Sequence, residues 1–155
     1  MLSEATILIA VDDPRGADVR DLIAESDAYM QRLYPAESNH LVDADALSSP
    51  SAVFLTARDD SDLLGSIAYL VIAPDHAEMK RMFVRERARG VGLGRMLLRA
   101  MENEARSRSI HRISLETGIR QPEAVDLYRA YGYQDCGPFG SYQPDPLSLF
   151  MTKRL

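Results

Sequence analysis

A turn with three glycines at alternate positions constrains this chain more than any other feature. It reads Arg89-Gly90-Val91-Gly92-Leu93-Gly94-Arg95 and separates an apolar segment from residues 91–106, where apolar residues recur at helical spacing. Such a turn opens a helix, whose first turn offers about four unpaired N–H groups and the positive end of the helix dipole. The turn therefore predicts a cradle for an anion, with close packing of small residues as the alternative.

The spacing of these glycines disfavours two common nucleotide-binding turns. A dinucleotide-binding turn needs Gly-x-Gly-x-x-Gly, but its third position falls on Arg95 when counted from Gly90 and on Leu97 when counted from Gly92. A P-loop needs a second glycine five residues after its first, followed by Lys and then Ser or Thr. Arg95 occupies the position of that second glycine when counted from Gly90. Dinucleotide binding and NTP hydrolysis are therefore disfavoured.

Strand and helix patterns alternate along the rest of the chain. We expect strands over residues 6–11, 53–57, 64–72, 77–84, 113–116 and 147–153, and helices over residues 17–33, 43–47, 91–106 and 122–131. The sequence has no internal repeat and no long linker, and 155 residues with 46% hydrophobic content suit one core. We therefore expect a single domain over residues 1–155 with a mixed α/β sheet.

The composition of the chain limits which binding partners, cellular locations and metal sites can be expected. The 18 basic and 23 acidic residues give a net charge of -5, which disfavours nucleic acid and anionic membranes. No apolar run approaches the ~20 residues of a membrane helix, and residues 1–11 resemble a strand rather than a signal peptide. Cys136 is the single cysteine, and His40, His76 and His111 lack metal-ligand spacing. We expect a cytoplasmic protein without a metal.

The glycine turn resembles motif A of the GCN5-related N-acetyltransferase (GNAT) family, in which Arg or Gln is followed by x-x-Gly-x-Gly or Ala. Arg89, Gly92 and Gly94 occupy those positions. Residues 78–84 resemble the family's fourth strand, and residues 122–133 resemble its last helix with a Leu-Tyr-x-x-x-Gly-aromatic ending. The resemblance, to a small bacterial-type member, implies a mostly antiparallel sheet of about six to seven strands flanked by about four helices.

Acetyl-CoA is the co-substrate that this resemblance implies. The main chain of Met82, Phe83 and Val84 would bind the pantetheine arm as an added strand. The turn would hold the pyrophosphate through the backbone of Arg89, Gly90, Val91, Gly92, Leu93, Gly94 and Arg95, with an arginine side chain adding charge.

The implied reaction is direct attack of a neutral amine on the thioester, which needs a base and an acid. The resemblance gives the acid role to Tyr128 and the base role to Glu78. Strand alternation puts Glu78, Lys80 and Met82 on one face unless a bulge intervenes, so Glu78 could equally form a surface ion pair with Lys80. Glu116 is a competing base or a carboxylate that orients the amine.

The first fifty residues carry the acceptor hypothesis. Residues 34–40 join the first two expected helices, and we expect Glu37 and His40, with Glu116, to recognise a small-molecule primary amine. The alternative is a polar loop with capping residues. A second loop, residues 138–142, is placed to close the pocket.

Other functions fit part of the pattern. The acceptor amine could belong to a protein or an aminoacyl-tRNA, and a non-catalytic sensor of acyl-CoA would need only the glycine turn. Family members often pair through sheet edges or the C-terminal strand, so the resemblance also allows a homodimer.

Overall fold

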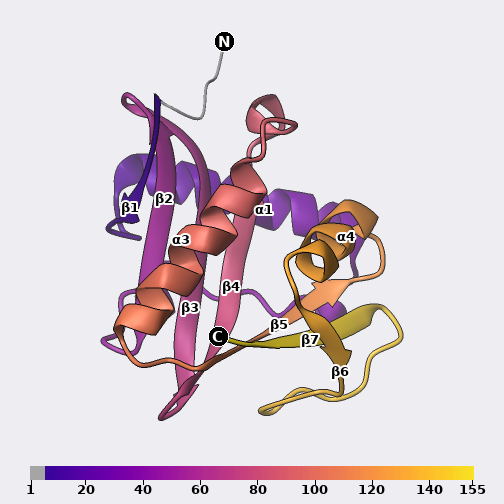
Figure 1. The fold of residues 1–155 in the computed structure, drawn as a ribbon. Coiled ribbons are helices and arrows are strands. Elements are labelled where there is room, and N and C mark those ends of the chain that lie inside the picture. The colour runs from indigo at the N-terminus through magenta and orange to yellow at the C-terminus, as the bar shows by residue number, and fades with distance from the viewer. Residues whose placement is uncertain (1–5) are drawn as a thin grey trace.

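Seven strands form one mixed sheet in the order β1-β2-β3-β4-β5-β7-β6 (Figure 1). The computed structural model describes residues 6–155, so residues 1–5 of the expected N-terminal strand segment lie outside the described part. The strands are β1 Ile7–Val11, β2 Ala52–Asp59, β3 Asp62–Ala73, β4 His76–Val84, β5 Arg112–Gly118, β6 Gln134–Cys136 and β7 Ser148–Arg154. The helices are α1 Ala17–Leu33, α2 Ala44–Leu47, α3 Leu93–Ser107 and α4 Pro122–Ala130, with 3-10 turns at Ala36–Ser38 and Glu86–Ala88.

The expected mixed, mostly antiparallel sheet with four helices is confirmed, with two differences in detail. Strand β6 was not predicted, because its three residues are all exposed and carry no apolar alternation. Helix α3 begins at Leu93 rather than at residue 91, because Gly92 has a left-handed backbone with φ of 81° and caps the helix from outside.

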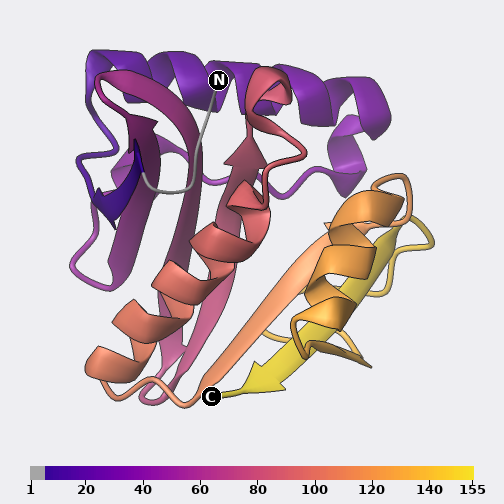
Figure 2. The same ribbon diagram turned by 45° about the horizontal axis from the view of Figure 1, so that its top comes forward.

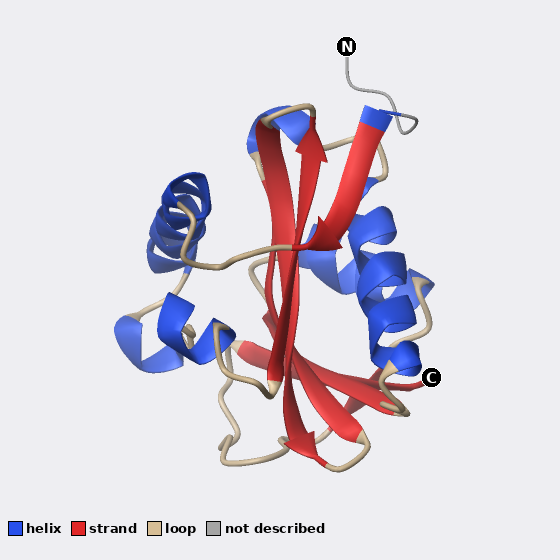
Figure 3. Ribbon diagram, turned by 90° about the vertical axis from the view of Figure 1, so that its left-hand side faces the viewer, coloured by secondary structure: helices blue, strands red, loops and turns tan. Residues whose placement is uncertain are grey.

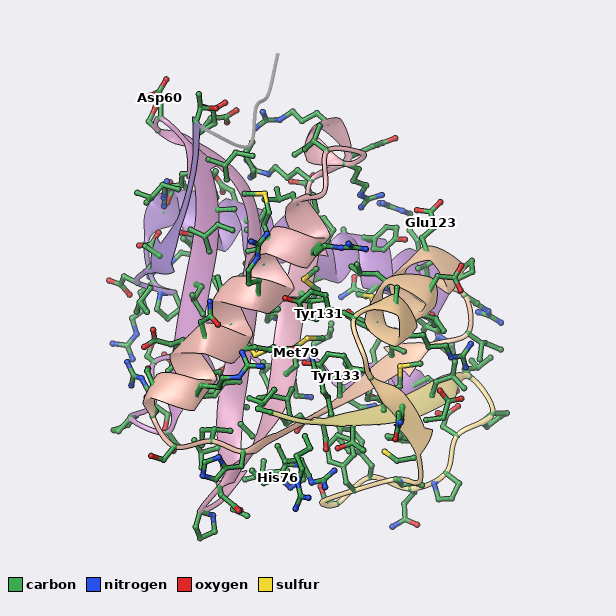
Figure 4. All side chains as sticks on the ribbon, viewed as in Figure 1. Asp60, His76, Met79, Glu123, Tyr131 and Tyr133 are labelled. Carbon is green, nitrogen blue, oxygen red and sulfur yellow. The ribbon has the colours of Figure 1, made fainter. Side chains whose placement is uncertain are left out.

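Helices cover both faces of the sheet. Helices α1 and α2 lie on one face, and α3 and α4 lie on the other (Figure 3). Each face has its own apolar cluster: Leu97 of α3 packs in one, and Leu22 of α1 packs in the other. Met79 of β4 and Tyr133 belong to the α3 side, where Figure 4 shows them near α3 and α4.

The sheet splits after a short parallel contact. Strands β4 and β5 are parallel and pair at three positions, the last of which joins Glu78 to Ser114. Beyond this position no pairing joins them, and Figure 2 shows their ribbons diverging. The unpaired main chain of both strands therefore faces the opening between them.

A β-bulge interrupts β4 just where the two strands separate. Ser66 of β3 pairs with Phe83 and Ala68 pairs with Lys80, so one residue of β3 opposes two residues of β4, Arg81 and Met82. Arg81 has a φ of 54°, and its carbonyl accepts a hydrogen bond from Ser66 Oγ at 2.8 Å. The extra residue reverses the alternation of side chains along the strand.

The bulge corrects the expectation that Glu78, Lys80 and Met82 share a face. Met82 packs in the apolar cluster on the α3 side, as Met79 does before the bulge. Phe83 packs on the α1 side. Glu78 and Lys80, which alternate with Met79, therefore lie on the face opposite Met82.

Candidate active site

Two cavities meet where β4 and β5 diverge. The larger cavity, of about 780 Å³, lies between β4, the glycine turn and α4. The smaller cavity, of about 120 Å³, lies between α1, the end of β5 and residues 38–42. The side chains that line both are Tyr29, Met82, Phe83, Gln121 and Tyr128. A molecule in one cavity therefore lies next to a molecule in the other.

The glycine turn forms an open backbone cradle in the larger cavity. Gly90 and Gly92 have left-handed backbones, with φ of 85° and 81°, and nothing lies within 4 Å of the position of a Cβ on either residue. The first helical hydrogen bond runs from Met96 N–H to Gly92 O at 3.1 Å, so the N–H groups of Leu93 to Arg95 precede the helical ladder. This geometry fits a pyrophosphate anion.

The residues predicted for the coenzyme line the larger cavity, with Val91 as the exception. The Val91 side chain is exposed. Arg89 donates from Nε to Val84 O at 3.0 Å, and its guanidinium lies 5.4 Å from the ring centre of Tyr29. Arg95 is exposed at the rim of the cavity. One arginine thus braces the turn, while the other is available to an anion.

Tyr128 stands at the junction of the two cavities. It lies on α4, which begins with Pro122 at its first position, and its side chain is buried but borders both cavities. Burial raises the pKa of Tyr128, so the phenol keeps its proton at neutral pH. Among residues 6–155 no hydrogen bond to its hydroxyl is present, which leaves the O–H to donate to a ligand.

A hydrogen-bonding contact between His40 and Glu116 lines the smaller cavity. His40 Nδ1 lies 2.9 Å from both carboxylate oxygens of Glu116, and Ser148 Oγ donates to Glu116 Oε2 at 2.8 Å. Glu116 comes after the last position at which β5 pairs with β4. The splayed end of β5 therefore presents this carboxylate to the opening.

Glu78 is buried beside the smaller cavity and lines neither cavity. The Tyr142 hydroxyl donates to Glu78 Oε2, and Lys80 Nζ lies 3.0 Å from the same oxygen. Lys80 also donates to the Tyr142 hydroxyl at 2.5 Å. The ion pair between Glu78 and Lys80, which the sequence suggested as an alternative to a base role, is therefore present. The Glu78 carboxylate has two donors, Tyr142 and Lys80.

The structure brings some acceptor-site residues together and leaves one apart. His40 and Glu116 meet in the smaller cavity, whereas Glu37 is exposed on the 3-10 turn and lines neither cavity. Its neighbour Ser38 lines the smaller cavity and donates to Asp145 Oδ2 at 2.7 Å. This bond ties the 3-10 turn to the C-terminal loop, on the side where residues 138–142 were expected to close the pocket.

Sequence reasoning did not find the partner of Gln121, a residue that borders both cavities. The Tyr34 hydroxyl donates to Gln121 Oε1 at 3.1 Å and accepts from Arg120 N–H at 3.1 Å. Tyr34 comes this close only because residue 118 is glycine, since a Cβ there would lie 1.9 Å from the hydroxyl oxygen. No short-range pattern links residues that lie so far apart in sequence.

Comparison with known proteins agrees with this geometry. The family model described as "Acetyltransferase (GNAT) family" matches residues 18–133. An "IAA acetyltransferase" of Azospirillum brasilense is 46% identical over 150 residues, covering 96% of this chain and 98% of that protein. The crystal structure of a putative acyl-CoA N-acyltransferase from Klebsiella pneumoniae is 36% identical, with a TM-score of 0.85 over 98% of this chain and 99% of that chain.

A more distant structure shares the fold. It is a GNAT family acetyltransferase from Elizabethkingia anophelis with acetyl-CoA bound, 16% identical, with a TM-score of 0.74 over 98% of this chain and 100% of that chain. The fold, the glycine cradle and these similarities together define an acyl-CoA-dependent transferase. The chain belongs to the GNAT acetyltransferase family and is an acetyl-CoA-dependent N-acetyltransferase.

Within residues 6–155, no helix is both long and apolar enough to cross a membrane. In the same part of the chain, no group of three or more His, Cys, Asp or Glu side chains is arranged to hold a metal ion.

Proposed function

We propose that this enzyme acetylates a primary amine of a small molecule by direct attack on acetyl-CoA. The observation that carries the proposal is the meeting of the two cavities at the buried hydroxyl of Tyr128. The pyrophosphate would lie on the N–H groups of residues 90–95, and the pantetheine arm would run along the main chain of Met82 to Val84. The amine would enter from the smaller cavity.

The reaction needs two proton transfers, one away from the acceptor amine and one to the leaving thiolate. The acceptor ammonium loses a proton, and the free amine then attacks the thioester carbonyl to form the C–N bond. When the C–S bond breaks, the thiolate takes the proton of Tyr128, and the phenolate recovers one from the new amide nitrogen. A phenol that burial keeps protonated suits this acid role.

Two carboxylates compete for the base side of the reaction, and their surroundings favour different roles. Glu78, the base that the sequence favoured, is held by Tyr142 and Lys80 and lines neither cavity. Glu116 lines the smaller cavity with its partner His40. We therefore place proton removal on the Glu116 side and keep Glu78 as the alternative for experiment.

A small acceptor fits the smaller cavity better than a protein or an aminoacyl-tRNA does. The cavity measures about 120 Å³, and the Ser38–Asp145 hydrogen bond links two of the segments around it. A relative named IAA acetyltransferase also points to a small molecule. The net charge of -5 argues against tRNA.

The test combines binding with turnover. Calorimetry with coenzyme A measures the donor site, and thiol release from acetyl-CoA with a panel of small amines, peptides and aminoacyl-tRNA measures transfer. We expect release with small amines. Coenzyme A binding without release for any acceptor would instead support a sensor, and release with peptide or tRNA alone would contradict the small-molecule assignment.

A further inference from the structure

His40 is fixed in the smaller cavity by contacts at both its ring and its backbone. Its ring nitrogen Nδ1 contacts the Glu116 carboxylate at 2.9 Å. Its carbonyl oxygen accepts a hydrogen bond from Lys80 Nζ at 3.2 Å. Because residues 39–43 form neither helix nor strand, such contacts replace the backbone bonds that regular structure would supply.

Arg81 holds the same segment two residues further on. Its guanidinium donates to Val42 O from Nε at 2.8 Å and from a terminal nitrogen at 2.6 Å, and it is paired with Asp27. Its side chain is only 4% exposed. Arg81, the residue with a left-handed backbone in the β4 bulge, therefore fixes the segment that carries His40. Its strained backbone conformation thus has a specific structural role.

The contact with Glu116 decides which ring nitrogen of His40 is free to accept a proton. A carboxylate accepts hydrogen bonds, so the neutral imidazole carries its hydrogen on Nδ1 and its lone pair on Nε2. Among residues 6–155 no hydrogen bond to Nε2 is present, and the ring lines the smaller cavity and is partly exposed. The arrangement leaves Nε2 as a proton acceptor for a molecule in that cavity.

The charged and titratable groups around His40 come from three parts of the chain. Glu116 of β5 contacts the ring, Lys80 of β4 contacts the carbonyl, and the C-terminal loop brings Tyr142 and Asp145. The Tyr142 ring packs edge-on, with its centre 5.2 Å from that of the imidazole. The carboxylates of Glu116 and Asp145 stabilise the imidazolium that a base becomes, while the Lys80 ammonium opposes it.

We propose that His40 is the base that removes the proton from the acceptor ammonium and that Glu116 is a positioning residue. The inference rests on the acetyl transfer proposed above. Nε2 takes the proton as the amine becomes neutral, the C–N bond forms, the C–S bond breaks, and Tyr128 protonates the thiolate. The proton on His40 then leaves to solvent, so each cycle releases amide, thiol and one proton. Both oxygens of Glu116 are already engaged by His40 and Ser148, which leaves the imidazole as the group that meets the amine.

The kinetic test compares His40→Gln with His111→Gln, a matched change at an exposed histidine that lines neither cavity. The acceptor is whichever amine of the panel is turned over. We expect His40→Gln to lower kcat/KM for that amine at pH 7 by roughly 10²-fold, the lower range for lost general base catalysis. Coenzyme A affinity and the His111→Gln variant should match the wild type.

The pH profile separates a base from a structural residue. The wild-type rate should rise with pH to a plateau, which is reached once the base is in its neutral form. In His40→Gln the rate should keep rising toward the pKa of the amine itself, because only amine already neutral in solution reacts. The proposal would be overturned if His40→Gln kept the wild-type plateau or the wild-type turnover. It would also be overturned if Glu78→Gln shifted the plateau to another pH and His40→Gln did not.

A second measurement needs no substrate and so tests the inference even if the acceptor assignment fails. Long-range ¹H–¹⁵N correlation spectra of labelled protein above pH 8 report which imidazole nitrogen carries hydrogen. We expect His40 to carry it on Nδ1, and His40→Gln assigns the signal. Hydrogen on Nε2 would refute the base role, whereas an inactive wild type that binds coenzyme A would count against the proposed function.

Discussion

The hydroxyl of Tyr142 donates a hydrogen bond to the Glu78 carboxylate and accepts one from Lys80. Burial and, to a smaller extent, the neighbouring Glu78 raise the pKa of Tyr142, so its hydroxyl remains a donor at neutral pH. The three groups satisfy one another beside the smaller cavity, which Lys80 lines but Glu78 and Tyr142 do not. A carboxylate that is held by two donors and lines neither cavity is poorly placed to exchange protons with an acceptor.

Tyr142→Phe tests this arrangement. The variant removes one hydrogen-bond donor from Glu78 and one acceptor from Lys80, and we expect the free energy of unfolding to fall by about 1–3 kcal/mol. Coenzyme A affinity should not change, because Tyr142 lines neither cavity. Urea unfolding at pH 7 measures the effect, with Tyr131→Phe as the control since its hydroxyl has no hydrogen bond in residues 6–155. Equal stability of the two variants would contradict the role given to Tyr142.

Tyr128→Phe should abolish most turnover without disturbing coenzyme A binding. Loss of the acid that protonates the thiolate should lower kcat by roughly 10²-fold or more. Because burial raises the pKa of Tyr128, its deprotonation should not produce an alkaline limb below pH 10 in the wild type. Steady-state kinetics and calorimetry check both points, and wild-type kcat in the variant would remove Tyr128 from the mechanism.

Gly92→Val should eliminate coenzyme A binding. The new side chain would project from a left-handed residue into the open cradle, where nothing lies within 4 Å. The matched control is Gly140→Val, since Gly140 also has a left-handed φ, of 58°, and open surroundings but lines neither cavity. Both variants should lose about 1–2 kcal/mol of stability from backbone strain, and calorimetry should find lost affinity in Gly92→Val alone. Unchanged affinity there would refute the pyrophosphate assignment.

Features decided by local sequence were predictable. The glycine turn, the extent of α1 and the start of α4 at Pro122 follow from spacing, backbone freedom and a proline at the first helical position. The anion cradle could be placed by the same reasoning, because its parts lie within seven consecutive residues. The resemblance of Tyr128 to the family tyrosine predicted a functional role for it, and the structure shows its side chain at the border of both cavities.

Features decided by distant contacts were not predictable. His40 and Glu116 are 76 positions apart, and only the splay of β5 brings them together. The bulge at Arg81 has no Gly or Asn to mark it, so the alternation of β4 was expected to continue. Sequence reasoning therefore located the residues around the larger cavity better than those around the smaller one.

Gly118→Ala should destabilise the protein through Tyr34. The added Cβ would lie 1.9 Å from the Tyr34 hydroxyl oxygen and push the ring away from Gln121 and Arg120. We expect a loss of about 1–3 kcal/mol, as for other overpacked sites. In a Tyr34→Ala background the same substitution should cost less, and urea unfolding of the four proteins measures this coupling. Additive losses would show that the two residues do not clash.

Acid sensitivity should depend on Arg58, which bridges Asp12 and Asp18 at 2.9 and 2.5 Å. Desolvation raises the pKa of Asp12, but hydrogen bonds from Thr56 and Arg58 outweigh it and lower that pKa overall; the hydrogen bond from Arg58 chiefly lowers the pKa of Asp18. Groups with lowered folded pKa values stabilise the fold above the unfolded value, near 3.9, and lose that effect as the pH falls through the folded values.

Arg58→Gln should therefore be less stable than the wild type at pH 7 and should lose less stability on acidification below about pH 4. Urea midpoints between pH 7 and pH 3 measure both curves. Parallel curves would show that Arg58 does not set these carboxylate pKa values.

The bulged stretch of β4 links the two cavities. Met82 and Phe83 border both cavities, while Arg81 holds the segment that carries His40, so in the proposed mechanism one short stretch of strand contacts both substrates and positions the base. Selection on acceptor preference cannot act on this stretch without also altering the hold on acetyl-CoA. Changes of acceptor should therefore accumulate in the C-terminal loop and at α1 positions such as Ser26 and Met30, which line the smaller cavity but not the larger one.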